Sequence, residues 1–224
     1  MLRLFNGDYR VAFDSIPDSS IDLCITDPPY KFENAGGGFY AKNNSTHRTY
    51  LDSLRQVGCC TFEPTEFLDI LKPKMKKFYG YFFCNKTLLV PYITWAQKNK
   101  YNYDVLVMAK SNPIPAYNNH HLSDLEYIVL IREKGTYWSK EKDLDRYRKF
   151  YMTSCKKTPH PAEKPIELLE RFVKVSTEQG MTVLDPFAGS GSTGVACKRN
   201  NRNFIGIEIN LHYYEMMERK INNE

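Results

Sequence analysis

Six short segments that are apolar almost throughout constrain the fold of this chain more than any other feature of its sequence. They span residues 21–26, 78–84, 105–109, 127–131, 182–185 and 203–207. A strand with one exposed face alternates apolar and polar residues, whereas a parallel strand that is covered on both faces is apolar along its length. The six segments therefore predict buried strands of a parallel sheet.

Helical patterns lie between these segments. Apolar residues recur at helical spacing in residues 64–75, 87–98, 163–179 and 211–221, and a further helix-compatible run begins at Thr193. Strands that alternate with helices predict an α/β fold, with a doubly wound, mostly parallel, Rossmann-like sheet and helices on both faces. A chain of 224 residues fits one domain, so we expect residues 1–224 to form it.

Composition excludes several other classes of protein. Hydrophobic residues make up 42% of the chain and charged residues 25%, which are values of a globular protein. No apolar run approaches the roughly 18–20 residues of a membrane span. The N-terminus reaches an acidic residue by Asp8 and lacks the pattern of a secretory signal, so we expect a cytoplasmic protein with no membrane partner. The six cysteines form no CxxC pair, and we expect no metal site.

Two polar segments interrupt the alternation. Residues 31–50 include three consecutive glycines and predict a mobile loop. Residues 132–158 hold nine Lys and Arg against four Asp and Glu, an excess of five that equals the net charge of the whole chain, and aromatic residues are interleaved with them. One interpretation is a solvated charged face, and the other is a surface that contacts nucleic-acid phosphates and bases.

A glycine-rich turn follows the apolar segment that ends at Asp185. Gly189, Gly191 and Gly194 fit the pattern GxGxxG between a predicted strand and a predicted helix, and Glu208 ends the next strand nineteen residues after Gly189. Such a turn lets the backbone approach a ligand closely, and the acid can accept both hydroxyls of a ribose. The order strand, turn, helix, strand and acid favours a nucleoside site.

The residues before these glycines favour one nucleoside over another. A dinucleotide-binding turn normally begins its glycines straight after the strand, whereas here Asp185-Pro-Phe comes first. A carboxylate at the tip of a strand suits a cation better than a pyrophosphate. S-adenosylmethionine (SAM) carries an amino group and a sulfonium, so the turn favours SAM over NAD.

A second turn, Asp27-Pro28-Pro29-Tyr30, follows the first apolar segment. Two consecutive prolines hold the backbone extended and rigid. The exocyclic amine of adenine or cytosine is a poor nucleophile until two acceptors hold its hydrogens, and the Asp27 carboxylate and the Pro28 carbonyl can serve as these acceptors. Tyr30 can stack on the base, which must leave the duplex to reach such a pocket.

Together these residues resemble the DNA amino-methyltransferases, which methylate the 6-amino group of adenine or the 4-amino group of cytosine. The Asp27 turn precedes the Asp185 turn, so the chain resembles the permuted β-class. Asn6-Gly7-Asp8 resembles the family's short N-terminal strand, residues 125–128 its hEyi strand, and residues 160–165 its HPTQKP-like segment. The resemblance implies catalysis at Asp27, Pro28, Pro29 and Tyr30, and SAM binding at Asp8, His160, Lys164, Pro165, Asp185, Phe187, Gly189, Gly191, Thr193 and Glu208.

The resemblance also implies double-stranded DNA as substrate and allows a homodimer. Residues 132–159 stand where many members carry a longer target-recognition insert, so they predict a short basic target-recognition segment. The resemblance favours adenine, because DPPY is more usual in the adenine members of the family, whereas cytosine members often begin this turn with Ser. The alternatives are cytosine 4-amino methylation, methylation of an RNA amine or a protein amide, a non-catalytic DNA-binding subunit, and an NAD oxidoreductase.

Overall fold

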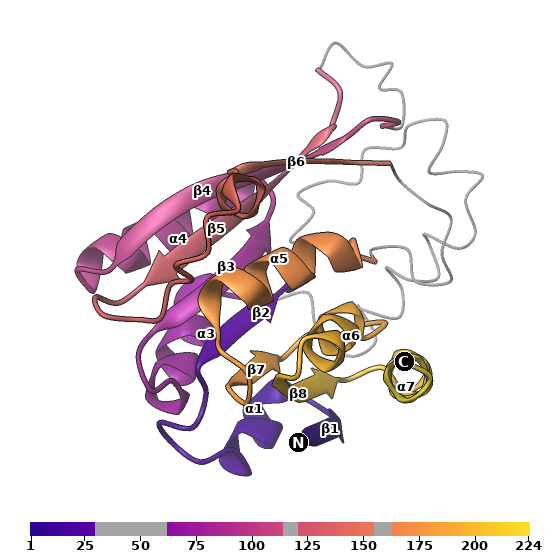
Figure 1. Ribbon diagram of the computed structural model, residues 1–224. Helices are drawn as coiled ribbons and strands as arrows, with labels where there is room; N and C mark the ends of the chain where they lie inside the picture. Colours follow the sequence, from indigo (N-terminus) through magenta and orange to yellow (C-terminus); the bar gives the residue numbers. More distant parts are fainter. Residues whose placement is uncertain (30–61, 114–120, 155–162) are drawn as a thin grey trace, which may run out of the picture.

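The computed structural model describes residues 1–29, 62–113, 121–154 and 163–224 (Figure 1). Its described strands form one sheet in the order β1-β8-β7-β2-β3-β5-β4-β6. Their bounds are β1 (Leu2–Asn6), β2 (Leu23–Thr26), β3 (Tyr79–Cys84), β4 (Asn102–Lys110), β5 (Leu125–Arg132), β6 (Phe150–Thr153), β7 (Thr182–Asp185) and β8 (Asn203–Glu208).

Strand β5 runs against the direction shared by the other described strands. It pairs antiparallel with both β3 and β4, whereas the remaining neighbours in the sheet pair in parallel. Cys84, the last residue of β3, therefore lies opposite Tyr127, close to the start of β5. The first residues of β5 consequently lie at the carboxyl edge of the parallel strands, where open α/β sheets bind their ligands.

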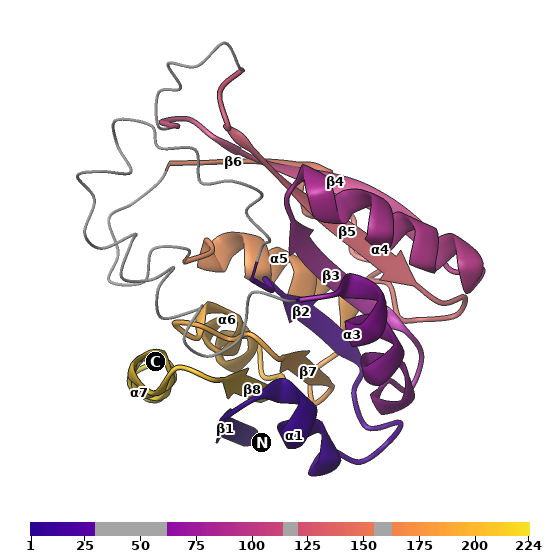
Figure 2. The same cartoon turned by 180° about the vertical axis from the view of Figure 1, so that it is seen from behind.

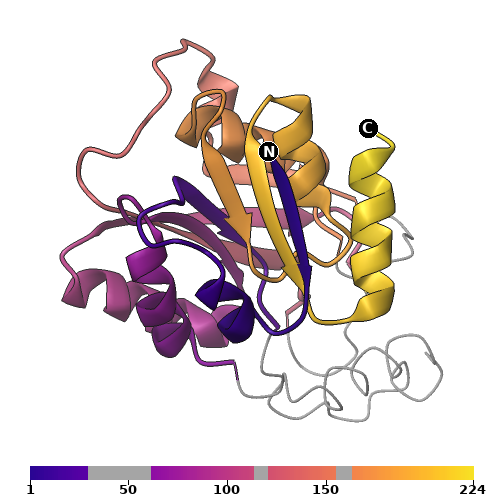
Figure 3. The ribbon, with the colours of Figure 1, turned by 90° about the horizontal axis from the view of Figure 1, so that it is seen from below.

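Helices cover both faces of the sheet. Figures 1 and 2 show α5, α6 and α7 over one face and α1, α3 and α4 over the other, and Figure 3 shows β1 beside β8. The helices are α1 (Tyr9–Asp14), α3 (Pro64–Leu71), α4 (Lys86–Lys98), α5 (Ile166–Ser176), α6 (Ser192–Arg199) and α7 (Leu211–Asn222), with short 3₁₀ turns at η2 (Lys72–Lys74) and η3 (Leu144–Tyr147).

Burial explains the apolar strands. Every residue of β2, β3 and β7 is buried, because helices cover these central strands on both sides. Cys24 and Cys84 lie in this core as small apolar side chains. The predicted α/β fold with a mostly parallel, doubly wound sheet is confirmed.

Several boundaries differ from the predicted ones, each for a local reason. Helix α3 ends at Leu71 and continues only as a 3₁₀ turn, since Pro73 has no N–H to donate. Helix α5 begins at Ile166 rather than at residue 163, because Pro165 takes the N-cap position. Strand β6 was not predicted: it is a four-residue edge strand on β4, and its side chains Phe150 and Met152 are exposed, so no buried apolar run marks it.

Candidate active site at the carboxyl edge of the sheet

Asp27 directly follows β2, and Asp185 is the last residue of the neighbouring strand β7. Strands β2 and β7 pair in parallel, with Cys24 opposite Leu184, so the residues that follow both strands emerge at one edge. The hydroxyl of Thr26 donates to Oδ1 of Asp185 at 2.8 Å, and Asp27 follows Thr26 directly. The Asp27 carboxylate is near enough to contribute to the raised pKa of Asp185. The structure thus brings the two predicted turns together.

Asp185 is buried, and three donors hold its carboxyl group. Thr26 and the backbone N–H of Phe187 donate to Oδ1, at 2.8 and 3.2 Å, and the Thr193 hydroxyl donates to Oδ2 at 2.7 Å. Burial raises the pKa of Asp185 to about 7, although these three hydrogen bonds oppose the shift. A carboxylate accepts about four hydrogen bonds, so capacity for about one further donor is left.

The glycine turn connects Asp185 to Glu208. Gly189 and Gly191 both adopt positive φ, at +52° and +83°. The N–H of Gly189 donates to Oε2 of Glu208 at 2.9 Å, and the N–H of Asn210 donates to Oε1 at 2.8 Å. Burial raises the pKa of Glu208, although backbone donors, among them these two, oppose the shift. Glu208 therefore fixes the turn and retains further acceptor positions on its two oxygens.

Two glycines of the pattern, Gly194 and Gly191, also have packing roles. A Cβ on Gly194 would overlap the side chains of Ile221 and Phe204. Helix α6 can therefore lie this close to α7 and β8 only because residue 194 has no side chain. A Cβ on Gly191 would stand 2.8 Å from Cγ and 3.1 Å from Cα of Met217 in α7. Gly191 thus combines a left-handed backbone with a close approach of α7.

Gly191→Ala is expected to lower the free energy of unfolding by about 3 kcal/mol, because backbone strain and overlap with Met217 add. Gly180→Ala is the matched control. Gly180 has nearly the same φ, +81°, but no atom lies within 4 Å of its added Cβ, so only strain of about 1 kcal/mol is expected. Urea unfolding followed by circular dichroism measures both. Equal losses in the two variants would show that contact with α7 is unimportant.

Asp8 and Phe187 border the same corner of the sheet. Because β1 lies beside β8, the N–H of Gly7 reaches the carbonyl of Glu208 at 3.0 Å, and Asp8 comes next in the chain. The Asp8 carboxylate caps α1 by accepting from the N–H of Arg10 at 2.8 Å. Phe187 packs against Tyr9 with ring centroids 5.0 Å apart. Both predicted residues therefore lie beside the glycine turn, Asp8 next to the end of β8 and Phe187 within the turn itself.

Lys164 contacts Asp27, and nothing in the sequence predicts this contact. The resemblance assigns Lys164 to SAM, but its ammonium forms an ion pair with Oδ2 of Asp27 and lies 3.3 Å from Oε2 of Glu126. Glu126, near the start of the reversed strand β5, was not a candidate residue. Its only sequence signal was its place in the hEyi-like segment. Pro28 is buried and Pro29 half-buried beside Asp27.

Some predicted residues lie outside the described part of the chain, namely Tyr30, His160, the loop at 31–50 and residues 155–159 of the basic segment. In the described part of that segment, Arg146 pairs with Asp143 at 2.9 Å, Arg148 pairs with Asp145 at 2.7 Å, and Lys149 pairs with Asp104. Acidic neighbours thus neutralise part of the predicted basic surface.

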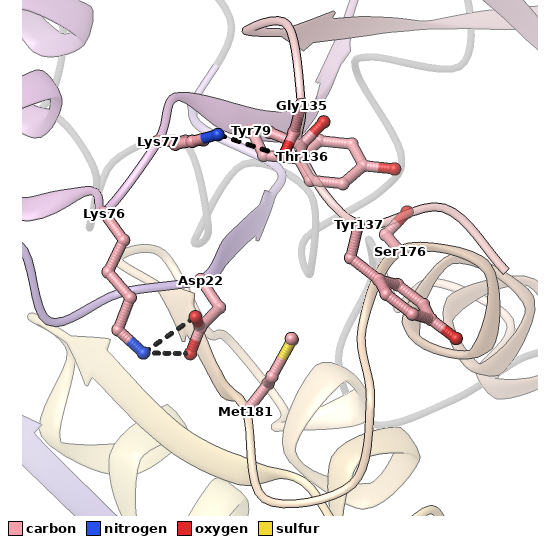
Figure 4. A pocket seen from close by; sticks show the side chains of 9 residues that line it. All are labelled: Asp22, Lys76, Lys77, Tyr79, Gly135, Thr136, Tyr137, Ser176 and Met181. Atoms are coloured by element: carbon pink, nitrogen blue, oxygen red, sulfur yellow. Dashed lines mark hydrogen bonds and ion pairs between the residues drawn. The ribbon is translucent and has the colours of Figure 1, made fainter.

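A pocket of about 230 Å³ lies at the opposite edge of the sheet (Figure 4). Asp22, Lys77 and Met181 line it, just before the starts of β2, β3 and β7. Its two lysines already have partners. Lys76 binds both oxygens of Asp22 at 2.8 and 2.9 Å, and Lys77 donates to the carbonyl of Gly135 at 3.1 Å. This pocket is remote from the paired strand tips and is not the candidate active site.

The described part of the chain holds neither a cluster of metal ligands nor a helix that could cross a membrane. Residues 1–29, 62–113, 121–154 and 163–224 contain no group of three or more His, Cys, Asp or Glu that could hold a metal ion. In the same ranges, no helix is both long and apolar enough to cross a bilayer.

Comparison with known proteins identifies the family. The model of the DNA methylase family (N6_N4_Mtase) matches residues 21–219, so the chain belongs to this family of DNA methylases. It is 26% identical to the type II methyltransferase M.HpaI of Haemophilus parainfluenzae, over 99% of this chain and 74% of that protein. It is 27% identical to the DNA adenine methyltransferase YhdJ of Escherichia coli K12, over 97% and 82% respectively.

Solved structures share the fold. The M1.HpyAVI–SAM complex superimposes with a TM-score of 0.73 at 24% identity, covering 98% of this chain and all of that one. The cytosine-N4-specific PvuII DNA methyltransferase gives 0.70 at 17% identity, covering 99% and 90%. The architecture of this chain is therefore that of DNA methyltransferases.

Proposed function

We propose that this protein transfers the methyl group of SAM to the 6-amino group of an adenine flipped out of double-stranded DNA. The observation that carries the proposal is the shared edge of β2 and β7, where a hydrogen bond from Thr26 to Asp185 joins the Asp27 turn to the glycine turn. One turn suits a cationic nucleoside and the other a nucleobase amine, and a methyl transfer requires the two side by side.

The residues of the glycine turn fit SAM. The buried Asp185 can accept one more donor, which suits the amino group of the methionine part, and Glu208 can accept ribose hydroxyls. Positive φ at Gly189 and Gly191 brings the backbone near a ligand without a side chain between them. When bound, SAM supplies an electrophilic methyl group on its sulfonium.

The Asp27 turn supplies the acceptors for the target amine. Its carboxylate and the Pro28 carbonyl each accept a hydrogen bond from one of the two hydrogens of the amino group. These hydrogen bonds let the nitrogen become pyramidal, so that its lone pair is no longer conjugated with the ring. As the nitrogen bonds to the methyl group, the bond from sulfur to that methyl breaks and S-adenosylhomocysteine leaves. Positive charge develops on the nitrogen, the Asp27 carboxylate stabilises it, and the nitrogen then loses one of its hydrogens as a proton to solvent. The same geometry accepts a cytosine 4-amino group. We favour adenine because Asp begins the turn and because similar proteins such as YhdJ are named adenine methyltransferases.

The described cysteines do not support methylation at carbon 5 of cytosine, which needs a thiolate nucleophile. Burial raises the pKa of the Cys84 thiol to about 12, with the Asp27 carboxylate adding to the shift. Burial likewise raises the pKa of Cys24 and Cys197. These three thiols stay protonated at neutral pH.

Incubation with SAM labelled in its methyl group and unmethylated plasmid DNA, followed by digestion to nucleosides, tests the proposal. We expect the label in N6-methyladenine. Label in N4-methylcytosine would support the proposed active site but show that its target base is cytosine. Label in 5-methylcytosine, or no labelled nucleoside, would contradict the proposed mechanism.

A further inference from the structure

The ammonium of Lys164 lies between two carboxylates. It pairs with Oδ2 of Asp27 and lies 3.3 Å from Oε2 of Glu126, while its charge also lies over the ring of Phe83, 5.2 Å from the centroid. Glu126 reaches this edge only because β5 is reversed, which places its first residues beside the end of β3. Three separate parts of the chain therefore meet at one cation.

The cluster is enclosed and balanced in charge. The side chains of Lys164, Asp27 and Glu126 are 10%, 20% and 17% exposed. Lys110 adds a second cation, 2.5 Å from Oε1 of Glu126. Two lysines thus face two carboxylates. In such an enclosed place, a charge that loses its partner is strongly unfavourable.

The pKa values of Lys164 and Glu126 are shifted in the directions that favour their charged forms. Burial lowers the pKa of Lys164, but Asp27 and Glu126 outweigh burial and leave the pKa above the ordinary value of lysine. Burial raises the pKa of Glu126, but Lys164 and Lys110 outweigh it and leave the pKa below the ordinary value. Lys164 and Glu126 consequently keep their charges at neutral pH.

The ion pair of Asp27 with Lys164 competes with the role proposed for Asp27 in catalysis. Its carboxylate must accept a hydrogen from the target amine, yet Lys164 binds one of its oxygens. Lys164 cannot simply leave, because an enclosed ammonium needs an anion. Glu126 provides that anion, since a small movement of the ammonium from Asp27 toward Oε2 of Glu126 keeps the cation paired.

We propose that Glu126 is a positioning residue for methyl transfer: it shares Lys164 with Asp27, so that Lys164 yields Asp27 to the target amine and remains paired with Glu126. This inference rests on the proposed function and adds a residue that acts through Lys164 rather than by contact with the base. A purely structural Glu126 would instead serve only as the partner of Lys110.

A double-mutant cycle separates the two roles. Glu126→Gln keeps the size of the side chain and removes its charge, so Lys164 should bind Asp27 alone and compete with the amine. We expect the single-turnover rate of methyl transfer to fall at least about tenfold, while SAM affinity stays within about twofold. In a Lys164→Met background, the same Glu126→Gln change should alter the rate by less than about twofold, because the cation through which Glu126 acts is gone.

Asp22→Asn is the matched control. Asp22 also pairs with a lysine, Lys76 (Figure 4), and its side chain is 12% exposed. It comes just before the start of β2 and so lies at the opposite edge of the sheet. Asp22→Asn should lower stability without changing the rate of methyl transfer. Glu126→Asp keeps the negative charge that Glu126→Gln removes, so it should retain part of the rate that Glu126→Gln loses.

The outcomes distinguish this proposal from the proposed function. Equal rate losses from Glu126→Gln with and without Lys164, or an unchanged rate in the single variant, would overturn the role of Glu126 alone. A wild-type protein that labels no DNA base would overturn both.

Discussion

Asp27→Ala is expected to lower the rate of methyl transfer to DNA by about a thousandfold, the scale seen when one preorganised electrostatic group is removed. The variant loses an acceptor for the amine and also the negative charge that stabilises the developing cation. Lys164 and Lys110 remain, and of the two carboxylates described in their ion pairs only Glu126 is left, so the cluster becomes more positive where positive charge must develop. Single-turnover labelling of DNA measures the rate.

SAM affinity should stay within about twofold in the same variant, because the glycine turn does not depend on Asp27 for its hydrogen bonds. The fold should persist, since Glu126 continues to pair with Lys164. Calorimetric titration with SAM and a thermal melt check these two statements. A variant with a normal rate would rule out Asp27 as the acceptor, and a variant that loses SAM binding would show that its effect is indirect.

The architecture could be predicted because burial on both faces leaves a clear mark in the sequence. Strands β2, β3 and β7 are buried throughout, and each appears as an apolar run. Edge strands leave no such mark. Strand β6 exposes Phe150 and Met152, and it forms because β4 offers an unpaired edge, which is a property of the folded sheet.

The candidate site was predictable where each turn carries its own chemistry. Asp27 and Asp185 stand out because each ends an apolar strand and opens a distinctive turn, and parallel pairing of β2 with β7 then brings them together. Lys164 and Glu126 were not predictable in the same way. The direction of β5 decides that Glu126 lies at the carboxyl edge, and an apolar segment does not reveal the direction in which it pairs.

The second large effect is expected at Asp185, whose carboxyl group has a pKa of about 7 because it is buried. A carboxyl group of raised pKa stabilises the fold at low pH, and this contribution is lost as the pH rises from the unfolded value toward 7. Asp185→Asn should therefore be at least as stable as the wild type at neutral pH. Asparagine can keep the contacts, since the hydroxyls of Thr26 and Thr193 can each donate or accept.

The affinity for SAM should increase as the pH rises, whereas the contribution of Asp185 to stability decreases. The amino group of SAM is a cation and binds the ionised carboxylate better than the protonated one. With a pKa of about 7, the ionised fraction of Asp185 should rise about eightfold between pH 6 and 7.5. Over the same range the protonated fraction of an α-amino group falls by about 30%, so the affinity for SAM should rise about sixfold. At pH 6, SAM binding should also release close to one proton. Calorimetric titrations in buffers of different ionisation enthalpy measure both quantities.

Asp185→Asn should bind SAM about a hundredfold more weakly at pH 7.5, as for loss of a buried charged hydrogen-bond acceptor, and its affinity should no longer rise with pH. Glu208 also has a raised pKa and contacts the same turn, so the variant is needed to assign the titration. A pH dependence that persists in Asp185→Asn would place the titrating group elsewhere. Wild-type affinity in that variant would leave Asp185 as a structural link between β2, β7 and α6, and the cation would then have to be held by another residue of the turn.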